Sequence, residues 1–484
     1  TSFKQLKRKV DQARRAQVRP PLSGGPTEYQ LQDVLKLLNQ GQLLKALGRA
    51  RLLIENFPDS VALHNFQGAA YAGLGNTEAA LASYRKAIKI DPEDADIFNN
   101  MGSTLRDLGD LDGAIDSYHR AIDLRPDFAE PYINLGNALS AKGDKEAALV
   151  NYVRAIEIRP DDAATHTRMG LVFQENGDLD EAIESYQQVI KIQPGVAEAY
   201  CNLGVAFHVK GDLDVALENY RQAIKIDPDY ESAHKNLGTA LEENEDYDSA
   251  IESYQQALKI NPDSSSIRHR LASLKGVQTE TAPRDYVENL FDGYAANFDK
   301  HLKDNLSYDT PDALAGMIAA HHPEGPVGSV LDLGCGTGLS GVALKSLFKR
   351  LEGVDLSSAM LRQAKQKDIY DKLSHMDIAE YLEQNELDFD YFVSADVLIY
   401  IGDLSQLFSL IKSRNKRNGR FAFSTEHRDE GDFFLETSGR YSHSRAYIEK
   451  LSKQFGYHLR HFNTTDLRKH KERTIKGGLY LLEF

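Results

Sequence analysis

The chain has 484 residues, 41% of them hydrophobic and 27% charged, a length that predicts at least two domains with separate cores. No segment approaches the roughly 20 consecutive apolar residues that a membrane helix requires, which excludes a helical membrane span. The formal net charge of −15 is uneven, because residues 27–264 carry 21 Lys and Arg against 40 Asp and Glu, and this excess disfavours nucleic acid as a ligand.

Residues 1–26 form a basic N-terminal segment, with seven basic residues and one acidic residue. The segment lacks the apolar core of a secretion signal, so we expect a cytoplasmic protein. A frayed first helix is the expected structure of this segment, in preference to an arm that binds nucleic acid. The only cysteines, Cys201 and Cys335, fall in different predicted domains, which predicts two free thiols in a reducing compartment.

A pattern that repeats every 34 residues follows. It contains glycines, small residues, tyrosines and prolines at fixed offsets: Gly68, Gly102, Gly136, Gly170, Gly204 and Gly238; Ala80, Ala114, Ala148, Ala182, Ala216 and Ala250; Tyr84, Tyr118, Tyr152, Tyr186, Tyr220 and Tyr254; Pro92, Pro126, Pro160, Pro194, Pro228 and Pro262. Over residues 61–264 this pattern resembles the tetratricopeptide repeat family. The small residues let two antiparallel helices approach, the tyrosine fills the space beside them, and the proline ends the second helix.

A weaker copy of the repeat runs from Thr27 to Ser60. It keeps Gly41, Ala46 and Pro58 but has Val34 in place of the close-approach glycine, which predicts a capping repeat. Residues 264–274 predict a closing helix. The repeat domain is therefore expected over residues 27–264, as an α-solenoid of about seven helix pairs.

The resemblance implies a superhelix whose first helices line a concave groove. The sixth position of these helices holds polar side chains: Asn100, Asn134, Arg168, Asn202 and Asn236. Asparagine amides can both donate to and accept from an extended peptide backbone, so we expect the groove to bind a protein or peptide. The alternative is that asparagine stands here without any ligand, and that the acidic residues are only solvated surface.

The repeat pattern ends after Gly276, and residues 277–284 are polar and aperiodic. Residues 265–284 are expected to form the closing helix and a linker, and residues 285–484 a second domain. In that domain apolar runs alternate with helical segments, which predicts an α/β fold with a parallel sheet. Its strands are expected at residues 330–333, 351–354, 391–394 and 420–424.

A glycine loop lies between the first of these strands and a helix that is expected to begin near Leu339. It contains Gly334, Gly336 and Gly338, and Asp355 follows Gly334 by 21 residues. This arrangement is typical of nucleotide binding, in which glycines admit the ligand and the acid takes the ribose hydroxyls. Dinucleotide enzymes have two residues between the second and third glycines, whereas Thr337 stands alone here, which favours S-adenosylmethionine.

The stretch VLDLGCGTG at 330–338 resembles the first motif of Rossmann-like class I methyltransferases, and GVDLSSAML at 353–361 resembles the second. Together with residues 286–308 and 439–444, the chain resembles predicted bacterial methyltransferases that carry tetratricopeptide repeats. The resemblance implies S-adenosylmethionine as cofactor. It also implies contacts to that cofactor from the following residues: Asp332, Gly334, Cys335, Gly336, Gly338, Asp355, Leu356, Met360, Asp377, Ile378, Ala395, Tyr294 and Phe298.

Methyl transfer needs a general base only for some acceptors. Candidates near the strand ends are His443, which is preferred, Glu426 and Tyr400, followed by His427 and Asp396. No signature of nucleic-acid amino methyltransferases and no metal-ligand cluster occurs.

Three functions remain open at this point. The domain could methylate a protein or peptide that the groove captures. It could instead methylate a small metabolite or glycan precursor, with the repeats used for assembly, or act as a non-catalytic cofactor-binding scaffold. The sequence indicates neither the acceptor nor the oligomeric state.

Overall fold

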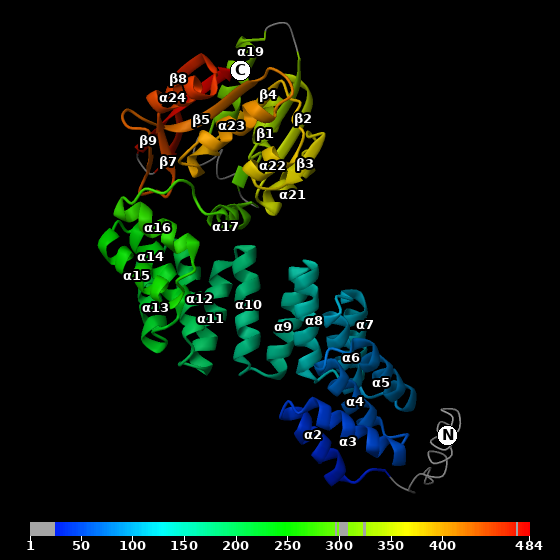
Figure 1. Ribbon diagram of the computed structural model, residues 1–484. Coiled ribbons are helices and arrows are strands. Elements are labelled where there is room, and N and C mark those ends of the chain that lie inside the picture. Colours follow the sequence, from blue (N-terminus) through cyan, green and yellow to red (C-terminus); the bar gives the residue numbers. More distant parts are fainter. Residues whose placement is uncertain (1–24, 296–297, 300–307, 323–325, 471–472) are drawn as a thin grey trace, which may run out of the picture. The chain divides into compact units, whose positions relative to one another are not determined.

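The computed structural model describes residues 25–295, 298–299, 308–322, 326–470 and 473–484, so the predictions for residues 1–24 lie outside the described residues. The chain forms two compact units, Thr1–Pro228 and Asp229–Phe484. The predicted α-solenoid followed by an α/β domain is confirmed (Figure 1). The boundary between the units falls within the repeats, so that the last helix pair belongs to the second unit.

From residue 25 onward, the described part of the first unit contains six antiparallel helix pairs. Their bounds are α2 Glu28–Asn39, α3 Leu43–Asn56, α4 Val61–Gly73, α5 Thr77–Ile90, α6 Ala95–Asp107, α7 Leu111–Leu124, α8 Ala129–Lys142, α9 Lys145–Ile158, α10 Ala163–Asn176, α11 Leu179–Ile192, α12 Ala197–Lys210 and α13 Leu213–Ile226. In the first five pairs, the second helix packs against the first helix of the following pair, as the side-by-side helices in Figure 1 show. No pair could bury both of its faces alone, so the array is stabilised by stacking.

The repeated glycine and tyrosine account for the close approach within each pair. A Cβ atom added at Gly136 would lie 2.6 Å from the Tyr152 ring, and one at Gly170 would lie 2.5 Å from Tyr186. Both tyrosine rings are fully buried. The tyrosine therefore occupies the volume that a side chain at the glycine would need.

The first pair caps the array, as its degenerate sequence predicts. Thr27 and Gln30 form a reciprocal capping box at the start of α2. Val34 stands in place of the glycine and is fully buried in a small core with Ala46, Ala50 and Leu63. The valine side chain thus fills the space that glycine leaves to tyrosine in the other pairs.

The second unit begins with α14 Glu231–Glu243, α15 Tyr247–Ile260 and the closing helix α16 Ser265–Lys275, and continues with α17 Arg284–Tyr294 and α19 Thr310–Ala320. Its strands are β1 Val327–Leu333, β2 Phe348–Asp355, β3 Lys372–His375, β4 Tyr391–Ser394, β5 Arg420–Arg428, β6 Phe433–Leu435, β7 Tyr441–Ser444, β8 His458–His470 and β9 Arg473–Glu483. The helices between them are α20 Leu339–Leu344, α21 Ser358–Gln366, α22 Ile378–Gln384, the 3₁₀ turn η1 Leu398–Tyr400, α23 Ser405–Arg414 and α24 Arg445–Phe455.

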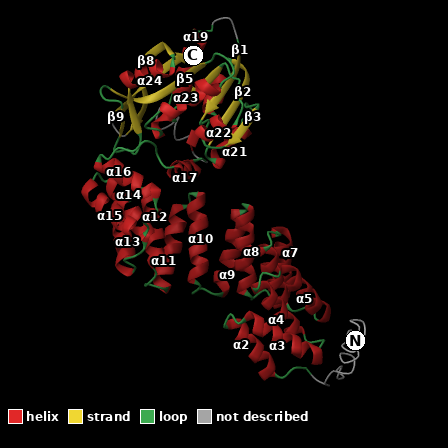
Figure 2. Cartoon of the chain, viewed as in Figure 1, coloured by secondary structure: helices red, strands yellow, loops and turns green. Residues whose placement is uncertain are grey.

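These strands form one mixed sheet. Its main path is β3-β2-β1-β4-β5-β7-β6, parallel from β3 to β7, while β9 pairs antiparallel with β5 and β8 with β9. Figure 2 shows the yellow strands flanked by red helices. All four predicted strands lie within β1, β2, β4 and β5.

Alternate residues of the central strands enter different cores. Leu331 and Leu333 of β1 pack with residues of α22, α23 and α24, whereas Val330 packs with residues of α19 and α20. The sheet is therefore covered on both faces, as parallel sheets generally are. This arrangement leaves the carboxyl ends of β1, β2 and β4 together at one edge, where ligands of such folds bind.

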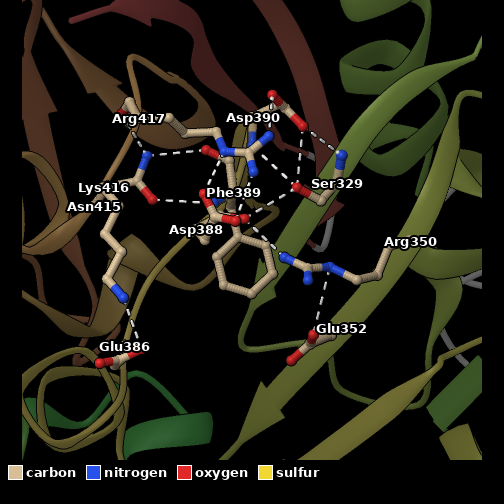
Figure 3. Close-up of polar contacts among 10 residues, drawn as sticks. All are labelled: Ser329, Arg350, Glu352, Glu386, Asp388, Phe389, Asp390, Asn415, Lys416 and Arg417. Carbon is tan, nitrogen blue, oxygen red and sulfur yellow. Dashed lines mark hydrogen bonds and ion pairs between the residues drawn. The ribbon is translucent and has the colours of Figure 1, made fainter.

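The opposite edge of the sheet is tied by charged side chains (Figure 3). Arg417 forms ion pairs with Asp388 and, at 3.2 Å, with Asp390, whose Oδ2 accepts from the Ser329 backbone N–H at 2.7 Å. The guanidinium of Arg350 donates to the Asp388 carbonyl at 2.7 Å. These contacts join the starts of β1, β2, β4 and β5.

Residues 277–283, expected to form a linker, contain no helix or strand but are bonded to the second unit. The Gly402 and Asp403 amides donate to the Glu280 carbonyl at 2.8 and 2.9 Å, and the Ala282 amide donates to the Tyr400 carbonyl at 2.9 Å. The Leu435 amide donates to Gln278 Oε1 at 2.7 Å. This segment is therefore part of the folded unit.

The closing helix α16 is bonded to the turn between β6 and β7. His269 is 3% exposed and its Nε2 lies 2.9 Å from the Gly439 carbonyl, while Arg270 donates to the Thr437 carbonyl at 3.4 Å. Arg270 also forms an ion pair with Glu242 of α14. The last repeat and the α/β sheet are joined by these contacts into one unit.

No helix among the described residues is long and apolar enough to cross a membrane.

Candidate functional site

A cavity of about 570 Å³ lies at the carboxyl edge of the parallel strands, within the second unit. Its lining comes from the glycine loop after β1, from the ends of β2 and β4, from α17 and from residues 280–284. The volume is in the range of pockets that hold cofactors and small ligands.

The glycine loop needs glycine because of its backbone. Gly334, Gly336 and Gly338 have φ angles of 75°, 54° and 90°, in the left-handed region that other residues rarely adopt. A Cβ atom at Gly334 would also lie 2.4 Å from the Val397 side chain, whereas one at Gly336 would meet nothing within 4 Å. Gly334 therefore allows the loop after β4 to approach, and Gly336 leaves open space for a ligand.

Asp355 ends β2, beside this loop, because β1 and β2 pair in parallel with Leu333 opposite Val354. Its Oδ2 accepts from the Gly336 amide at 2.7 Å and its Oδ1 from the Ser357 amide at 2.8 Å. Burial raises the pKa of Asp355 against the effect of these hydrogen bonds. A carboxylate has about four acceptor positions, so Asp355 keeps acceptor capacity for ribose hydroxyls.

An apolar slot adjoins Asp355. Leu356, Met360 and Ile378 line the same cavity, and Met360 is 1% exposed. Asp377 lies beside them as the N-cap of α22, with its Oδ1 accepting from the Ala379 amide at 2.8 Å and the Glu380 amide at 3.2 Å. The structure thus brings these four residues together with Ala395 in a wall suited to a flat ring system.

Helix α17 and Phe298 contribute to the wall of the cavity. Asp292 accepts from the Ser357 hydroxyl, and Asp299 accepts from the Thr337 hydroxyl and from Lys367 at 2.6 Å. Phe298 lines the cavity as expected, 5.9 Å from the Phe291 ring, which the sequence analysis had not singled out. Tyr294 ends α17, and its side chain lies outside the described residues.

Asp332 does not line the cavity, contrary to the expected contact with the cofactor. It has no exposed surface, and its Oδ2 accepts from the Tyr370 hydroxyl at 2.7 Å. Burial raises the pKa of Asp332 to about 7, although that hydrogen bond acts in the opposite direction. Asp332 lies inside the sheet because it belongs to β1 itself rather than to the loop that follows.

Cys335 lines the cavity but is only 3% exposed. Burial raises the pKa of its thiol well above its ordinary value. Its sulfur lies where a side chain at Gly353 would stand, since a Cβ atom there would be 2.9 Å away. Cys335 therefore packs the loop against β2.

His443, the preferred base, is fully buried and does not line the cavity. Its Nε2 lies 2.9 Å from the carbonyl oxygens of Ile401 and Gly402. Burial lowers the pKa of His443 to about 4, although the bonds to these carbonyls act in the opposite direction. The structure thus gives His443 the position of a structural donor that holds the loop after β4, which argues against the base role.

Two of the other base candidates, Tyr400 and Asp396, line the cavity, whereas Glu426 and His427 do not. Tyr400 lines it, with its ring 5.4 Å from Phe291. Glu426 is buried at the end of β5, and Asp396 lines the cavity directly. His427 is 3.7 Å from exposed Asp429 and is not among the lining residues.

Sequence reasoning missed Arg440 and residues 280–284 as parts of the cavity wall. Arg440 stands in a motif that was recognised, but no pattern in the sequence placed its side chain. Residues 280–284 were interpreted as a linker, and only their bonds to the loop after β4 show that they line the cavity.

The polar side chains of the predicted groove are half-buried on the first helices of their pairs. Asn100 donates to Asn65 at 3.0 Å, and Asn134 donates to Asn99 at 2.9 Å, so these amides join neighbouring repeats. Arg168 of α10 and Asn202 of α12 hold the matching positions in the first unit, and Asn236 of α14 does so in the second.

Among the described residues, no group of three or more His, Cys, Asp or Glu is arranged to hold a metal ion.

Family models of the tetratricopeptide repeat match residues 68–105, 102–143, 136–177, 161–229 and 232–264, and a methyltransferase domain model matches residues 330–419. The methyltransferase match contains the glycine loop, Asp355 and Asp396. Among curated proteins, none is significantly similar to this chain.

Several solved structures are similar to part of the chain. The MamA protein is 30% identical with a TM-score of 0.34, and the match covers 36% of this chain and 94% of MamA. YrrB, described as a TPR protein with an unusual peptide-binding site, is 24% identical with a TM-score of 0.35, over 38% of this chain and 96% of YrrB. MamA 41-end from Desulfovibrio magneticus RS-1 is 22% identical with a TM-score of 0.34, over 35% and 96% of the two chains.

Proposed function

Because this chain joins tetratricopeptide repeats to a class I methyltransferase domain, we propose that it is an S-adenosylmethionine-dependent methyltransferase whose repeats recruit a protein or peptide substrate or partner. The single observation that carries the proposal is the position of Asp355. It lies beside a loop of three left-handed glycines, at the edge of a cavity with an apolar slot.

The residues of the cavity fit this cofactor. Gly336 leaves room for a ligand against the backbone, and Asp355 keeps acceptor capacity for ribose hydroxyls. Leu356, Met360 and Ile378 supply apolar surface for the adenine. When bound, S-adenosylmethionine supplies a methyl group on a positively charged sulfur, which makes that group electrophilic.

The protein's own contribution is positioning and the exclusion of water. Methyl transfer is an in-line displacement, so an acceptor held in the correct orientation gains most of the available rate enhancement. The Phe291 ring stands against Tyr400, and α17 is fixed to the site through Asp292. These contacts cover the cavity and reduce the access of water.

The repeats supply the means of recruitment in this proposal. Residues 27–264 carry 21 basic against 40 acidic residues, so their surface attracts cationic partners. An asparagine amide has two hydrogens and one oxygen, and Asn100 uses one hydrogen on Asn65. The remaining capacity suits the backbone of an extended peptide.

Calorimetry with S-adenosylmethionine and the full chain tests the cofactor assignment. The Asp355→Ala variant loses bonds to two hydroxyls, so we expect about a hundredfold weaker binding. Asp371→Ala is the matched control. Asp371 accepts a hydrogen bond at 2.7 Å from the amide of Leu351, which belongs to β2 as Asp355 does, but Asp371 does not line the cavity. Absence of binding by the unaltered chain, or unchanged affinity in Asp355→Ala, would contradict the proposal.

A further inference from the structure

The half of the cavity beyond the glycine loop has a distinct charge pattern. Its lining includes the carboxylates Glu280, Asp396 and Asp403 and the cations Arg284 and Arg440, of which Arg284 forms an ion pair with Glu380 at 3.4 Å. Partial burial acts to raise the pKa of Asp403. Hydrogen bonds from Ser405 and Tyr447 have the larger effect, so the pKa of this carboxyl lies below its ordinary value. Carboxylates therefore outnumber cations where an acceptor would enter.

Asp396 is held in place by its backbone conformation and by Ser424. It is the second residue after β4 and has a φ angle of 55°, a left-handed conformation that is uncommon outside glycine. The buried Ser424 hydroxyl accepts from the Asp396 amide at 2.8 Å and donates to Asp396 Oδ1 at 2.9 Å. Strained backbone of this kind occurs at functional sites, where surrounding contacts hold it.

The register of the sheet places Asp396 beside the cofactor loop. Strands β1 and β4 pair in parallel with Asp332 opposite Val393, so the residues after β4 adjoin Gly334. The close approach of Val397 to Gly334 confirms this proximity. Asp396 therefore lies between the glycine loop and the end of β5.

Arg440 does not make this region a receptor for anions. Burial acts against its charge, but Tyr400, Glu426 and Asp396 outweigh burial and hold the pKa of Arg440 above its ordinary value. One guanidinium thus faces two carboxylates, and the sum of the three charges is negative. A further carboxylate from an acceptor would be repelled by Asp396 and Glu426.

From this arrangement we propose that the acceptor is an amine, received as a cation and oriented by Asp396 within the acidic half of the cavity. The proposal rests on the methyltransferase function proposed above. It agrees with the acidic repeats, since a basic peptide with a lysine side chain or a free amino terminus would be attracted by both.

The chemistry of transfer fits an amine better than an anion. The ammonium first gives a proton to Asp396 or to water, and the nitrogen lone pair then forms the new N–C bond. The S–C bond breaks with its electron pair remaining on sulfur, which becomes a neutral thioether. The positive charge moves from sulfur to nitrogen and stays within the acidic cavity, whereas an anionic acceptor would cancel it.

A binding experiment with the full chain tests how the negative charge of Asp396 affects the affinity for a positively charged ligand. Calorimetry gives the dissociation constants of S-adenosylmethionine, with a charged sulfur, and S-adenosylhomocysteine, with a neutral one. We expect Asp396→Asn to reduce the preference for the charged ligand by about tenfold. Asp368→Asn is the control, because Asp368 has a similar φ of 50° but does not line the cavity.

A transfer experiment tests the acceptor class itself. Labelled S-adenosylmethionine is offered with matched sets of primary amines, alcohols and carboxylates on the same carbon skeletons, and with peptides that contain lysine or glutamate. We expect label only in the amines and lysine peptides, and its loss in Asp396→Asn. Preferential labelling of alcohols or carboxylates, or no labelled amine while the cofactor binds normally, would overturn the proposal. Failure to bind S-adenosylmethionine would instead refute the proposed function.

Discussion

Asp332 is a carboxylate without exposed surface on the central strand β1. Among the described residues its Oδ1 has no hydrogen-bond partner, while Oδ2 accepts from Tyr370. Since burial raises its pKa from 3.8 to about 7, Asp332 is protonated in the folded protein at pH values where it is ionised in the unfolded chain. Its contribution to stability is complete below about pH 4 and is lost as pH rises through 7.

The Asp332→Asn variant tests this titration. The amide cannot ionise, so the free energy of unfolding of the wild type should fall relative to the variant by about 1.4 kcal/mol per pH unit between pH 4 and 7. Denaturant unfolding of both proteins at several pH values provides the measurement. A difference that stays constant with pH would show that Asp332 is already ionised in the folded state.

Single residues also show what sequence reasoning could not reach in the site. Asp355, Leu356 and Met360 of the recognised motif line the cavity, and the motif is visible in the sequence because the spacing of glycines and an acid is set by local backbone geometry. His443 is the preferred base from the sequence because its segment is rich in hydroxyl and aromatic residues and precedes a helix, so that it could fold over the pocket, yet the fold buries its ring under the loop after β4. Burial depends on contacts between distant segments, which no local pattern encodes.

At the scale of the element, the repeat pair depends on the contact between glycine and tyrosine. The Gly136→Ala variant would place a Cβ atom 2.6 Å from the Tyr152 ring, which must shift within a packed core. We expect the free energy of unfolding to fall by about 1 to 3 kcal/mol, measured by denaturant titration of the helical signal.

Gly48→Ala provides the matched control for this variant. Gly48 is also inside a repeat helix, but a Cβ atom there would meet nothing within 4 Å. Alanine is the better helix former, so we expect stability to be unchanged or to rise by up to about 1 kcal/mol. Equal effects of the two substitutions would mean that the tyrosine contact does not limit the approach of the helices.

The helices and strands themselves were predicted well from the sequence, for a physical reason. The repeat period and the apolar runs of the strands reflect local geometry and burial on one or two faces, which appear directly as patterns. Residues 277–283 have no such pattern, because their backbone bonds go to Tyr400, Gly402 and Asp403 more than 100 residues later. The sequence of such a segment therefore resembles that of a linker, even when its backbone is hydrogen-bonded to distant residues.

At the scale of the whole molecule, we expect a fragment of the second unit to keep its full stability only when it begins at the boundary of that unit, Asp229. A fragment of residues 229–484 retains α16, whose His269 is buried against Gly439 and lies 4.9 Å from the Tyr286 ring. We expect this fragment to bind S-adenosylmethionine within a few-fold of the full chain. Calorimetry and thermal unfolding provide the comparison.

A fragment of residues 277–484 lacks α16 and exposes the apolar cluster that contains Tyr286, Ile399, Tyr400 and Tyr441. We expect it to unfold at a lower temperature and to bind the cofactor more weakly, because Tyr400 is part of the cavity wall. If the shorter fragment were as stable as the longer one, the closing helix would contribute nothing to the stability of the second unit.

Both thiols of the chain, Cys201 and Cys335, are buried, and this has a practical consequence for labelling. The native protein presents no readily alkylated sulfur to a maleimide reagent. Cysteines introduced at Val150 of the first unit and Val342 of the second, whose side chains are 69% and 54% exposed, would therefore be the sole attachment points for a donor and an acceptor dye. Energy transfer between these dyes would follow any change in the separation of the two units when a ligand binds.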